Sequence, residues 1–326
     1  MNTMNTMLPE TGTVKAVRIH SFGGPEALCL EEVPLLKPGP DEVLVRVHAA
    51  GVNPSDWKVR EGQFGPLPLP RTLGGDFSGV VVALGSGVTD FFVGQSVFGH
   101  SAYGGAFAEL VAVPVSSVAP KAPSINDIEA AATPLCALTA WQALFEVADL
   151  QIGQKVLIHA AAGGVGLFAV QLALRYGAWV IATASSRNLP CLCRLGANQM
   201  IDHNATRFED TVKSVDVVLD LVGGETQDRS WKVLKNGGRL VSTVSTPSPE
   251  KAMLCGVRAS KMHTQMRADE LTLMGDMIAN GEIKVMVEKV LPLCRASEAL
   301  ELSRRGHVRG KIVLTIDHDT SHADCP

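Results

Sequence analysis

The chain has 326 residues, more than one ordinary hydrophobic core accommodates, so its length favours two domains. Hydrophobic residues make up 46% and charged residues 19%, and the net charge is −4. Such a chain has no global basic field to attract nucleic acid or an anionic membrane, and none of its apolar runs reaches the roughly 20 residues of a membrane span.

Neither the N-terminus nor the cysteines indicate secretion. The stretch MNTMNTMLPETGT has no basic region followed by an apolar one, so it is interpreted as a frayed leader rather than a signal peptide, and a cytoplasmic location is expected. The seven cysteines are scattered and contain no CxxC pair. We therefore predict free, buried thiols rather than a disulfide framework or a cysteine zinc site.

The N-terminal third of the chain is rich in short β-branched runs. VKAVRIH, EVLVRVHAAGVN, GGDFSGVVVALG, SVFGH and FAELVAVP are separated by turn signals such as KPGPDE and GSGVTD. Runs at this close spacing predict a small barrel-like β domain. Residues 127–150 then change to an alanine- and leucine-rich helical pattern that opens on Asn126 or Asp127 as a cap.

From residue 155 onward, strands alternate with helices. KVLIHA, WVIATA, NQMIDH, VDVVLDLV and GRLVSTVS are strand-like, and helical stretches separate them, which is typical of an α/β fold with a doubly wound parallel sheet. A further helix, a strand, a helix and a strand close the chain, and we expect the last three to rejoin the β domain. The predicted domains are therefore 1–128 with 284–326, and 129–283.

The stretch HAAAGGVG lies between a predicted strand and a predicted helix. In the fingerprint G-x-G-x-x-G, the second glycine lets the backbone approach a pyrophosphate and the third lets the helix pack on the strand. Here Gly163 and Gly166 take these two positions, and Ala161 replaces the first glycine. This turn, with Gly163, Gly164, Val165 and Gly166, is predicted to bind a dinucleotide at a helix N-terminus. The alternative is a plain tight strand-to-helix turn.

No acidic residue follows the second strand of this unit. An NAD site usually places Asp or Glu there to accept a hydrogen bond from the ribose 2′-hydroxyl. This chain instead has Ser185, Ser186, Arg187 and Asn188, whose hydroxyls and guanidinium would bind a 2′-phosphate. NADPH is therefore favoured over NADH. The alternative is that Arg187 is a solvated residue at a helix start.

Six motifs together resemble a known family over residues 14–316. The chain is similar to the medium-chain dehydrogenase/reductase superfamily, and within it to the zinc-free quinone oxidoreductase branch that includes zeta-crystallin-like proteins and enone reductases. The motifs are AGVNPSDWKVREG, LGGDFSGVVVALG, TPLCALTAWQAL, HAAAGGVG, DLVGG and GHVRGKIVL.

The resemblance implies a GroES-like β-barrel domain, a Rossmann domain, NADPH in the cleft between them, and a homodimer. Zinc-dependent relatives carry a Cys and a His-Glu pair as ligands and a lobe of four cysteines. The corresponding stretches here, residues 51–56 and 74–77, hold none of those ligands, and the cysteine lobe is absent. No metal is therefore expected.

The resemblance also implies roles for single residues. Asn53 falls near the nicotinamide, and Asp56 and Trp57 of the segment PSDWK line the same cleft as candidate catalytic residues. Asp56 could be a proton relay, or instead a capping or salt-bridged carboxylate, and Trp57 could be a core residue or part of the cleft wall. The candidate cofactor contacts besides the two stretches above are Thr139, His203, Val222, Val244, Ser245 and Arg309. His203 could instead be an exposed imidazole in a turn.

One departure from the family affects the mechanism. Many relatives that reduce activated double bonds carry a tyrosine shortly after the VNPxD segment, where this chain has Gln63 and Phe64. The two tyrosines of the chain, Tyr103 and Tyr176, lie elsewhere. We expect Asn53 or a backbone N–H to stabilise the charge that develops on the substrate oxygen, and water to supply the proton.

The function predicted from the sequence is hydride transfer from NADPH to a quinone or an α,β-unsaturated carbonyl compound. Three alternatives stay open. An enoyl reductase acting on thioesters or carrier-bound substrates would use the same hydride chemistry. A zinc-type alcohol dehydrogenase lacks its ligands here. A non-catalytic NADPH-binding protein would need no proton donor.

Overall fold

The computed structural model describes residues 12–316, so residues 1–11 of the predicted leader and Cys325 lie outside the described residues, whereas Thr13, the last residue of that leader, begins the first strand. By its internal contacts the chain divides into two compact units. The first extends to Leu135 and resumes at Met266, and the second is Cys136–Gln265. The resumed part of the first unit includes helix α9, Ala268–Ala279, which the sequence had assigned to the range 129–283.

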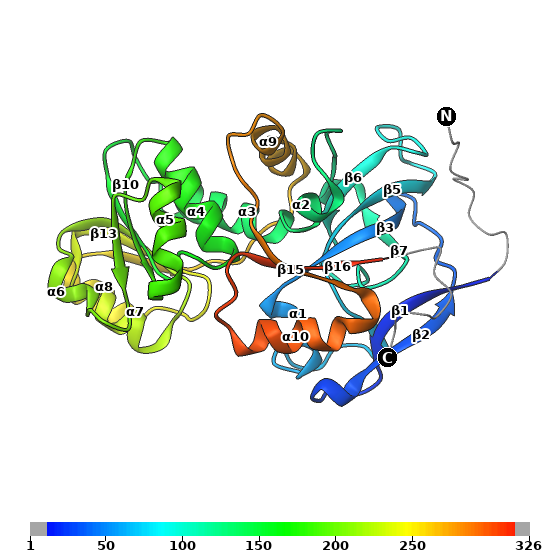
Figure 1. Cartoon of the computed structure of the whole chain (residues 1–326), viewed down its shortest axis with the longest axis horizontal. Coiled ribbons are helices and arrows are strands. Elements are labelled where there is room, and N and C mark those ends of the chain that lie inside the picture. Colours follow the sequence, from blue (N-terminus) through cyan, green and yellow to red (C-terminus); the bar gives the residue numbers. More distant parts are fainter. Residues whose placement is uncertain (1–11, 317–326) are drawn as a thin grey trace. The chain divides into compact units, whose positions relative to one another are not determined.

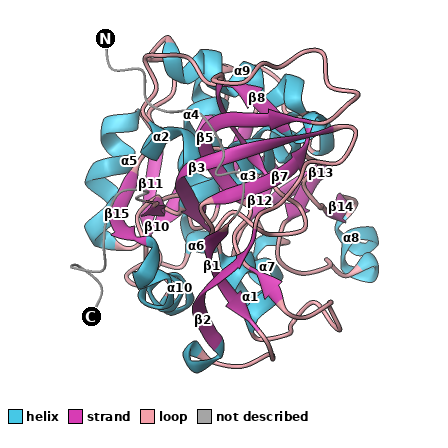
Figure 2. Cartoon of the chain, turned by 90° about the vertical axis from the view of Figure 1, so that its right-hand side faces the viewer, coloured by secondary structure: helices cyan, strands magenta, loops and turns pink. Residues whose placement is uncertain are grey.

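The first unit is built mainly from antiparallel strands. Its larger sheet has the order β15-β16-β3-β5-β6-β8, with β7 also paired to β3, and a small sheet has the order β2-β1-β4. Figure 2 shows β3, β5 and β7 running side by side. These strands are β1 (Thr13–Ile19), β2 (Leu28–Pro34), β3 (Glu42–Val52), β4 (Arg71–Thr72), β5 (Asp76–Leu84), β6 (Ser96–His100), β7 (Leu110–Pro114), β8 (Val118–Pro120), β15 (Val287–Pro292) and β16 (Lys311–Thr315).

Strand β3 is the centre of this unit because both of its faces are buried. Val43, Val45 and Val47 pack into the main apolar cluster, whereas Leu44 packs into a second cluster on the other face. Alternating side chains on one strand thus serve two layers. The helical segments of this unit are α1 (Pro54–Arg60), α2 (Asp127–Ala131), α9, α10 (Ala296–Arg305), and the short turns Pro25–Ala27, Val115–Ser117 and Leu293–Arg295.

The second unit contains a six-stranded, all-parallel sheet with the order β11-β10-β9-β12-β13-β14. The order reverses between β9 and β12, which makes this the switch point where doubly wound sheets bind their ligands. Figure 1 draws the unit in green and yellow. Its strands are β9 (Lys155–Ile158), β10 (Trp179–Ala184), β11 (Gln199–Asp202), β12 (Val215–Asp220), β13 (Leu234–Ser242) and β14 (Arg258–Lys261).

Helices connect these strands, as parallel pairing requires. Helix α4 packs on β9 and β10, α5 on β11, α7 on β12 and α8 on β14. Their bounds are α4 (Gly164–Arg175), α5 (Leu189–Leu195), α6 (Phe208–Thr211), α7 (Gly224–Ser230) and α8 (Pro249–Cys255), with a short turn at Ser186–Asn188. The alternating pattern predicted from residue 155 onward is confirmed.

The helix predicted over residues 127–150 is not continuous. It is divided into α2, α3 (Pro134–Trp141) and a wider π-helical turn, Gln142–Val147. Pro134 explains the first break, because proline has no N–H for the helix ladder and disfavours the α conformation in the residue before it. Asn126 is the predicted cap, and its side chain accepts a hydrogen bond from the Glu129 N–H at 2.9 Å.

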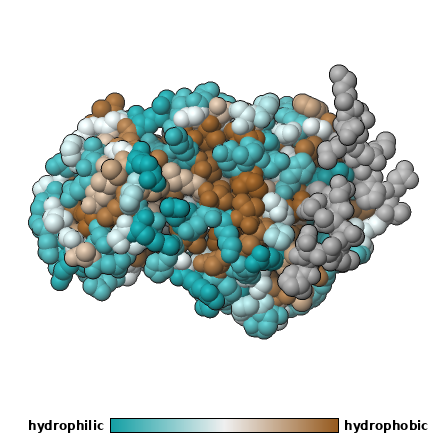
Figure 3. Space-filling model, viewed as in Figure 1, coloured by the Kyte–Doolittle hydropathy of each residue, from teal (hydrophilic) through white to brown (hydrophobic). Residues whose placement is uncertain are grey.

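The expectation of free, buried cysteines needs correction. Of the described cysteines, Cys136 and Cys191 are buried free thiols, but Cys29, Cys193 and Cys255 are exposed, and Cys294 is disulfide-bonded. The prediction of free, buried thiols therefore holds for two of them. Among the residues described, no helix is long and apolar enough to cross a membrane. Figure 3 shows hydrophilic residues over most of the face in view, with apolar residues in patches between them.

A buried arginine joins α1 to α10 within the first unit. Arg60 has no exposed surface, and its Nη2 donates to Glu301 at 2.8 Å and to Glu61 at 3.2 Å. Its Nε and Nη1 are buried with no hydrogen-bond partner among the described residues. Among the described residues, the desolvated guanidinium of Arg60 is therefore stabilised by the carboxylates of Glu61 and Glu301 alone.

We expect Glu301→Gln to lower the stability of the first unit by about 1.5–3 kcal/mol, because it removes a charged hydrogen-bond partner from a buried cation. Thermal unfolding followed by circular dichroism measures the change. The control is Glu298→Gln on the same helix, whose ion pairs with Lys289 and Arg295 are exposed, so its effect should stay below about 1 kcal/mol. Equal losses in the two variants would contradict this account of Arg60.

Candidate active site

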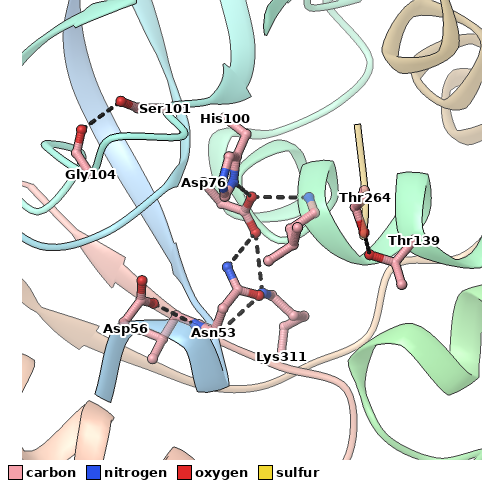
Figure 4. A network of polar contacts seen from close by, with 11 residues as sticks. Asn53, Asp56, Asp76, His100, Ser101, Gly104, Thr139, Thr264 and Lys311 are labelled. Atoms are coloured by element: carbon pink, nitrogen blue, oxygen red, sulfur yellow. Dashed lines mark hydrogen bonds and ion pairs between the residues drawn. The ribbon is translucent and has the colours of Figure 1, made fainter. Parts of the chain in front are cut away.

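A buried polar network lies where β3, β5 and β16 meet in the first unit (Figure 4). Asp76 begins β5 and is fully buried. Its Oδ1 accepts hydrogen bonds from His100 Nδ1 at 2.7 Å and from the Leu135 N–H at 3.0 Å. Its Oδ2 accepts from Asn53 Nδ2 at 2.8 Å and lies 3.3 Å from Lys311 Nζ. Four donors thus converge on one carboxylate.

Lys311 supplies the positive charge of this network. The first residue of β16, it is 4% exposed, and its ammonium donates to the Val52 carbonyl at 3.0 Å and also to Asn53 Oδ1. Burial disfavours the ionised form of Asp76, but Lys311 and the hydrogen bond from His100 outweigh it and lower the pKa of Asp76. Asp76 and Lys311 therefore form a buried, fully hydrogen-bonded ion pair.

The same network sets the start of helix α1. Asn53 precedes the helix, Pro54 occupies the first turn, and the Asn53 N–H donates to Asp56 Oδ2 at 2.7 Å. Asp56 is 6% exposed, and its burial raises its pKa to about 7 against the lowering effects of that N–H and of Lys311. Among the described residues its other oxygen, Oδ1, has no hydrogen-bond partner.

Asp56 opens onto a cavity of about 270 Å³ in the first unit. One wall is apolar, and the polar groups are few, which is typical of sites for small organic molecules. The lining residues that matter for the chemistry are Asp56, Phe64, Leu67, Arg71, Leu73 and His100. The loop Ser101–Gly104 closes one side, held by a hydrogen bond from Ser101 Oγ to the Gly104 carbonyl at 2.5 Å.

The three predicted catalytic residues have different surroundings. Asp56 lines the cavity. Asn53 is 1% exposed, and its amide oxygen and nitrogen are bonded to Lys311 and Asp76, so it orients other groups. Trp57 packs against the main apolar cluster, and Lys58 Nζ lies 5.5 Å from its ring centroid. Phe64, which stands where relatives often have tyrosine, is an exposed part of the cavity wall.

In the second unit, the glycine turn joins β9 to the 12-residue helix α4. A Cβ on Gly166 would lie 2.5 Å from the Ala160 carbonyl oxygen, closer than any real side chain approaches, so only glycine fits there. Gly163 is the N-cap of α4, and Gly164 and Val165 begin the helix. The residue of the turn with a positive φ, 47°, is Ala160, so position 161 does not require glycine and alanine fits there. This cradle fits a dinucleotide pyrophosphate.

The carboxyl end of β10 places the second group of predicted contacts. Ser185 caps the short turn Ser186–Asn188, and Asn188 is buried with its Nδ2 3.3 Å from Ser185 Oγ. Ser186 and Arg187 are exposed. His203, also exposed, follows β11, and its N–H donates to the Ala184 carbonyl at 3.1 Å. The backbone thus brings His203 beside the end of β10.

The carboxyl ends of β12 and β13 hold the third group. Asp220 is fully buried and accepts hydrogen bonds from the Gly223 N–H, Ser242 Oγ and Gln227 Nε2, each at 2.8 Å. Gln227 Nε2 also lies 3.1 Å from Ser245 Oγ. These bonds hold two exposed apolar residues at the switch-point edge of the sheet, namely Val222 and Val244. The predicted residues Val222, Val244 and Ser245 are therefore close together.

Two predicted contacts lie apart from these groups. Thr139 in α3 is 5% exposed, and its Oγ1 lies 2.6 Å from Thr264 Oγ1 within the second unit. Arg309 precedes β16 in the first unit, and its N–H donates to Glu288 at 2.7 Å. Arg309 therefore belongs to a different unit from the other predicted cofactor contacts.

Sequence reasoning missed several residues that organise the site. Lys311, His100 and Arg71 were not predicted, although Lys311 lies inside the motif GHVRGKIVL. A lysine that opens an apolar strand such as KIVLT is a usable signal, because a buried cation needs an acidic partner. His159 was missed as well. It is buried between Thr183 and Ser230, and burial lowers its pKa to about 4, so it is neutral.

Among the described residues no group of three or more His, Cys, Asp or Glu side chains is placed to hold a metal ion. The glycine turn, in contrast, is shaped for a dinucleotide.

Comparison with known proteins agrees with this geometry. Residues 39–124 match the alcohol dehydrogenase GroES-like domain, and residues 195–314 match the zinc-binding dehydrogenase family. Mouse quinone oxidoreductase is 30% identical over 93% of this chain and 98% of its own length. The structure of the Coxiella burnetii quinone oxidoreductase has a TM-score of 0.88 and 34% identity, covering 94% of this chain and all of that one.

A second similar structure is the Escherichia coli quinone oxidoreductase complexed with NADPH, with a TM-score of 0.86 and 29% identity over 92% of this chain and 99% of that one. Fold, turn and cavity together define a two-domain oxidoreductase that uses a nicotinamide cofactor and a small-molecule substrate. The chain belongs to the medium-chain dehydrogenase/reductase superfamily, in its zinc-free quinone oxidoreductase branch.

We expect Lys311→Met to destabilise the first unit by about 3–5 kcal/mol, because it leaves the buried carboxylate of Asp76 without its counter-charge. Adding Asp76→Asn to that variant should recover part of the loss. Thermal unfolding measures both. Lys289→Met on the neighbouring strand is the control, since Lys289 is 44% exposed and its ion pair is solvated. A loss in the control as large as that of Lys311→Met would refute the assigned role.

Proposed function

We propose that this protein is an NADPH-dependent reductase that transfers hydride to a quinone or an α,β-unsaturated carbonyl compound without a metal. The observation that carries the proposal is the cavity of the first unit, where the acid Asp56 meets a wall of apolar side chains. A flat, weakly polar acceptor fits such a wall, and an acid is what the acceptor needs once hydride has arrived.

The chain's own groups account for the proton. Asp56 keeps its proton below about pH 7, and the Asn53 N–H occupies its Oδ2. Oδ1 is then free to present the proton to the substrate oxygen. A bound nicotinamide supplies the hydride. As hydride adds to the substrate, an electron pair moves onto the carbonyl oxygen, Asp56 protonates that oxygen, and water reprotonates the carboxylate.

The remaining residues position these groups. Lys311 and Asp76 hold Asn53, and Asn53 holds Asp56, so we assign Asn53 a positioning role rather than direct contact with the substrate. Trp57 supports the same helix by packing on the core. Phe64 and Leu67 provide the apolar faces. These faces exclude water, and the exclusion of water strengthens the electrostatic effect of Asp56 on the developing charge.

The preference for NADPH is proposed from the end of β10. The exposed Ser186 and Arg187, with Ser185 and Asn188 beside them, offer hydroxyls and a guanidinium where an NAD site has a carboxylate. His203 comes close along the backbone and would contact the same phosphate. Gly163 and Gly166 would hold the pyrophosphate, and Thr139, Val222, Val244, Ser245 and Arg309 complete the proposed cofactor contacts. A homodimer is part of the proposal, and analytical ultracentrifugation tests it.

The function is tested by following oxidation of NADPH at neutral pH with benzoquinone, phenanthrenequinone, a short alkenone and crotonyl-CoA, in the presence of EDTA. We expect turnover with a quinone or the alkenone. Faster turnover of crotonyl-CoA would instead favour an enoyl-thioester reductase. Tight binding of NADPH without reduction of any acceptor would point to a binding protein and overturn the proposal.

We expect Arg187→Gln to raise the KM for NADPH about tenfold or more and to leave the KM for NADH nearly unchanged. The reason is that the cofactor group this guanidinium would bind, the 2′-phosphate, is absent from NADH. Steady-state kinetics with both cofactors measure the ratio. Arg194→Gln, an exposed arginine on the following helix α5, is the matched control and should change neither value. An equal effect on NADH and NADPH would refute the assignment of Arg187.

The proposed role of Asp56 predicts the pH dependence. Because the pKa of Asp56 is raised from 3.8 to about 7, the acid form is present at low pH and is lost as pH rises through about 7. In the wild type, kcat/KM should therefore fall above that pH. The same shift makes Asp56 lower the folding stability progressively between pH 3.8 and about 7.

We expect Asp56→Asn to reduce kcat about 100-fold below pH 7 and to flatten the pH profile, since asparagine keeps an acceptor for the Asn53 N–H but has no acidic proton. Asp276→Asn, an exposed residue of α9, is the control. A variant Asp56→Asn with an unchanged pH profile would show that the proton comes from elsewhere, with water as the first alternative.

A further inference from the structure

The cavity of the first unit contains one cationic side chain that the proposed chemistry does not use. Arg71 opens strand β4 and lines the cavity beside Asp56 and His100. Its backbone is fixed by pairing with Ile19 of β1. The side chain is partly buried. Within residues 12–316, its guanidinium has no hydrogen-bond or ion-pair partner.

The loop Ser101–Gly104 lies close to the Arg71 side chain. A Cβ built on Gly104 would lie 3.7 Å from Arg71 Nε and 2.6 Å from the Thr72 carbonyl oxygen. Gly104 has a φ of 80°, which favours glycine, and its carbonyl accepts from Ser101 Oγ. The loop therefore approaches Arg71 near its Nε, and both Arg71 and the loop line the cavity.

The other lining groups do not satisfy this charge. Among the described residues that line the cavity, Asp56 carries the only carboxyl group; its Oδ2 is bonded to the Asn53 N–H, and its acid form is neutral. His100 also lines the cavity, and its Nδ1 is hydrogen-bonded to Asp76. The other lining residues carry no charge: Val59, Phe64, Leu67 and Leu73 are apolar, and Ser55 and Ser101 are neutral. The cavity thus combines an apolar wall with one uncompensated positive group.

We infer that the acceptor reduced by this protein carries a carboxylate, and that Arg71 binds it while the unsaturated carbonyl lies against Asp56. The inference rests on the proposed function and narrows its substrate class to small, acidic enones or quinones. A guanidinium binds a carboxylate through two parallel N–H bonds, which fixes the orientation of the substrate as well as its affinity. At about 270 Å³ the cavity lies slightly below the ~300–1,000 Å³ usual for ligand pockets, which favours a small acceptor.

The test compares an acidic enone with its neutral ester on the full-length enzyme. The pair is 4-oxopent-2-enoate and its methyl ester, and NADPH oxidation gives kcat/KM for each. Arg71→Met removes the charge and keeps most of the side-chain volume, Arg71→Lys keeps the charge without the paired donors, and Arg305→Met, an exposed arginine of α10, is the control.

We expect Arg71→Met to lower kcat/KM for the carboxylate about tenfold or more, and to change that for the ester less than about twofold. Arg71→Lys should fall between the wild type and Arg71→Met, and Arg305→Met should match the wild type. Equal changes with both acceptors, or no change with either, would overturn the inference. Circular dichroism confirms that each variant is folded before it is used.

A binding measurement separates this inference from the proposed function. The saturated acid 4-oxopentanoate and its methyl ester cannot be reduced at a double bond, so isothermal titration calorimetry measures their affinity independently of turnover. About tenfold weaker binding of the acid to Arg71→Met supports the carboxylate site even if no acceptor is reduced. Equal binding to both proteins, or no binding to the wild type, refutes the site even if neutral quinones are reduced well.

Discussion

The buried ion pair between Lys311 and Asp76 is the interaction on which the active site of the first unit depends. It connects the start of β16 to the start of β5, and through the Val52 carbonyl and Asn53 it also holds the end of β3. Three strands far apart in the chain are thereby fixed at one point. Helix α1 begins at that point, so the pair also determines where Asp56 meets the cavity.

A buried ion pair is a weak source of stability, because desolvation offsets most of the attraction between its charges. Its value here is geometric. Every oxygen of Asp76 has a donor, and Lys311 has three oxygen acceptors, so neither group can reorient without leaving a buried charge unsatisfied. The network therefore specifies one arrangement of Asn53, and a specified arrangement is what a proton donor requires. Lys311 supplies the positive charge that the buried carboxylate of Asp76 needs.

Much of the second unit could be predicted from the sequence because its signals are local. The spacing of Gly163 and Gly166, the strand before them and the helix after them are contained in a short stretch, and the structure shows why Gly166 admits no side chain. The acidic partners of Lys311 and Arg60, Asp76 and Glu301, could not be predicted, since they are 235 and 241 residues away along the chain. The break at Pro134 carried a local signal, but the helical periodicity on both sides concealed it. Arg71 became a candidate only when the fold placed it beside Asp56.

Asp56 and Asp76 lie in the same network but differ in protonation state, and this difference indicates their roles. Asp76 touches Lys311 and receives four hydrogen bonds, so its pKa is lowered and it stays ionised. Asp56 is equally deep but receives one backbone N–H, and the charge of Asp76 adds to the burial that raises its pKa to about 7. Ionised Asp76 thus helps to keep Asp56 protonated. When two neighbouring acids are separated in this way, the protonated one is the candidate donor and the ionised one its support.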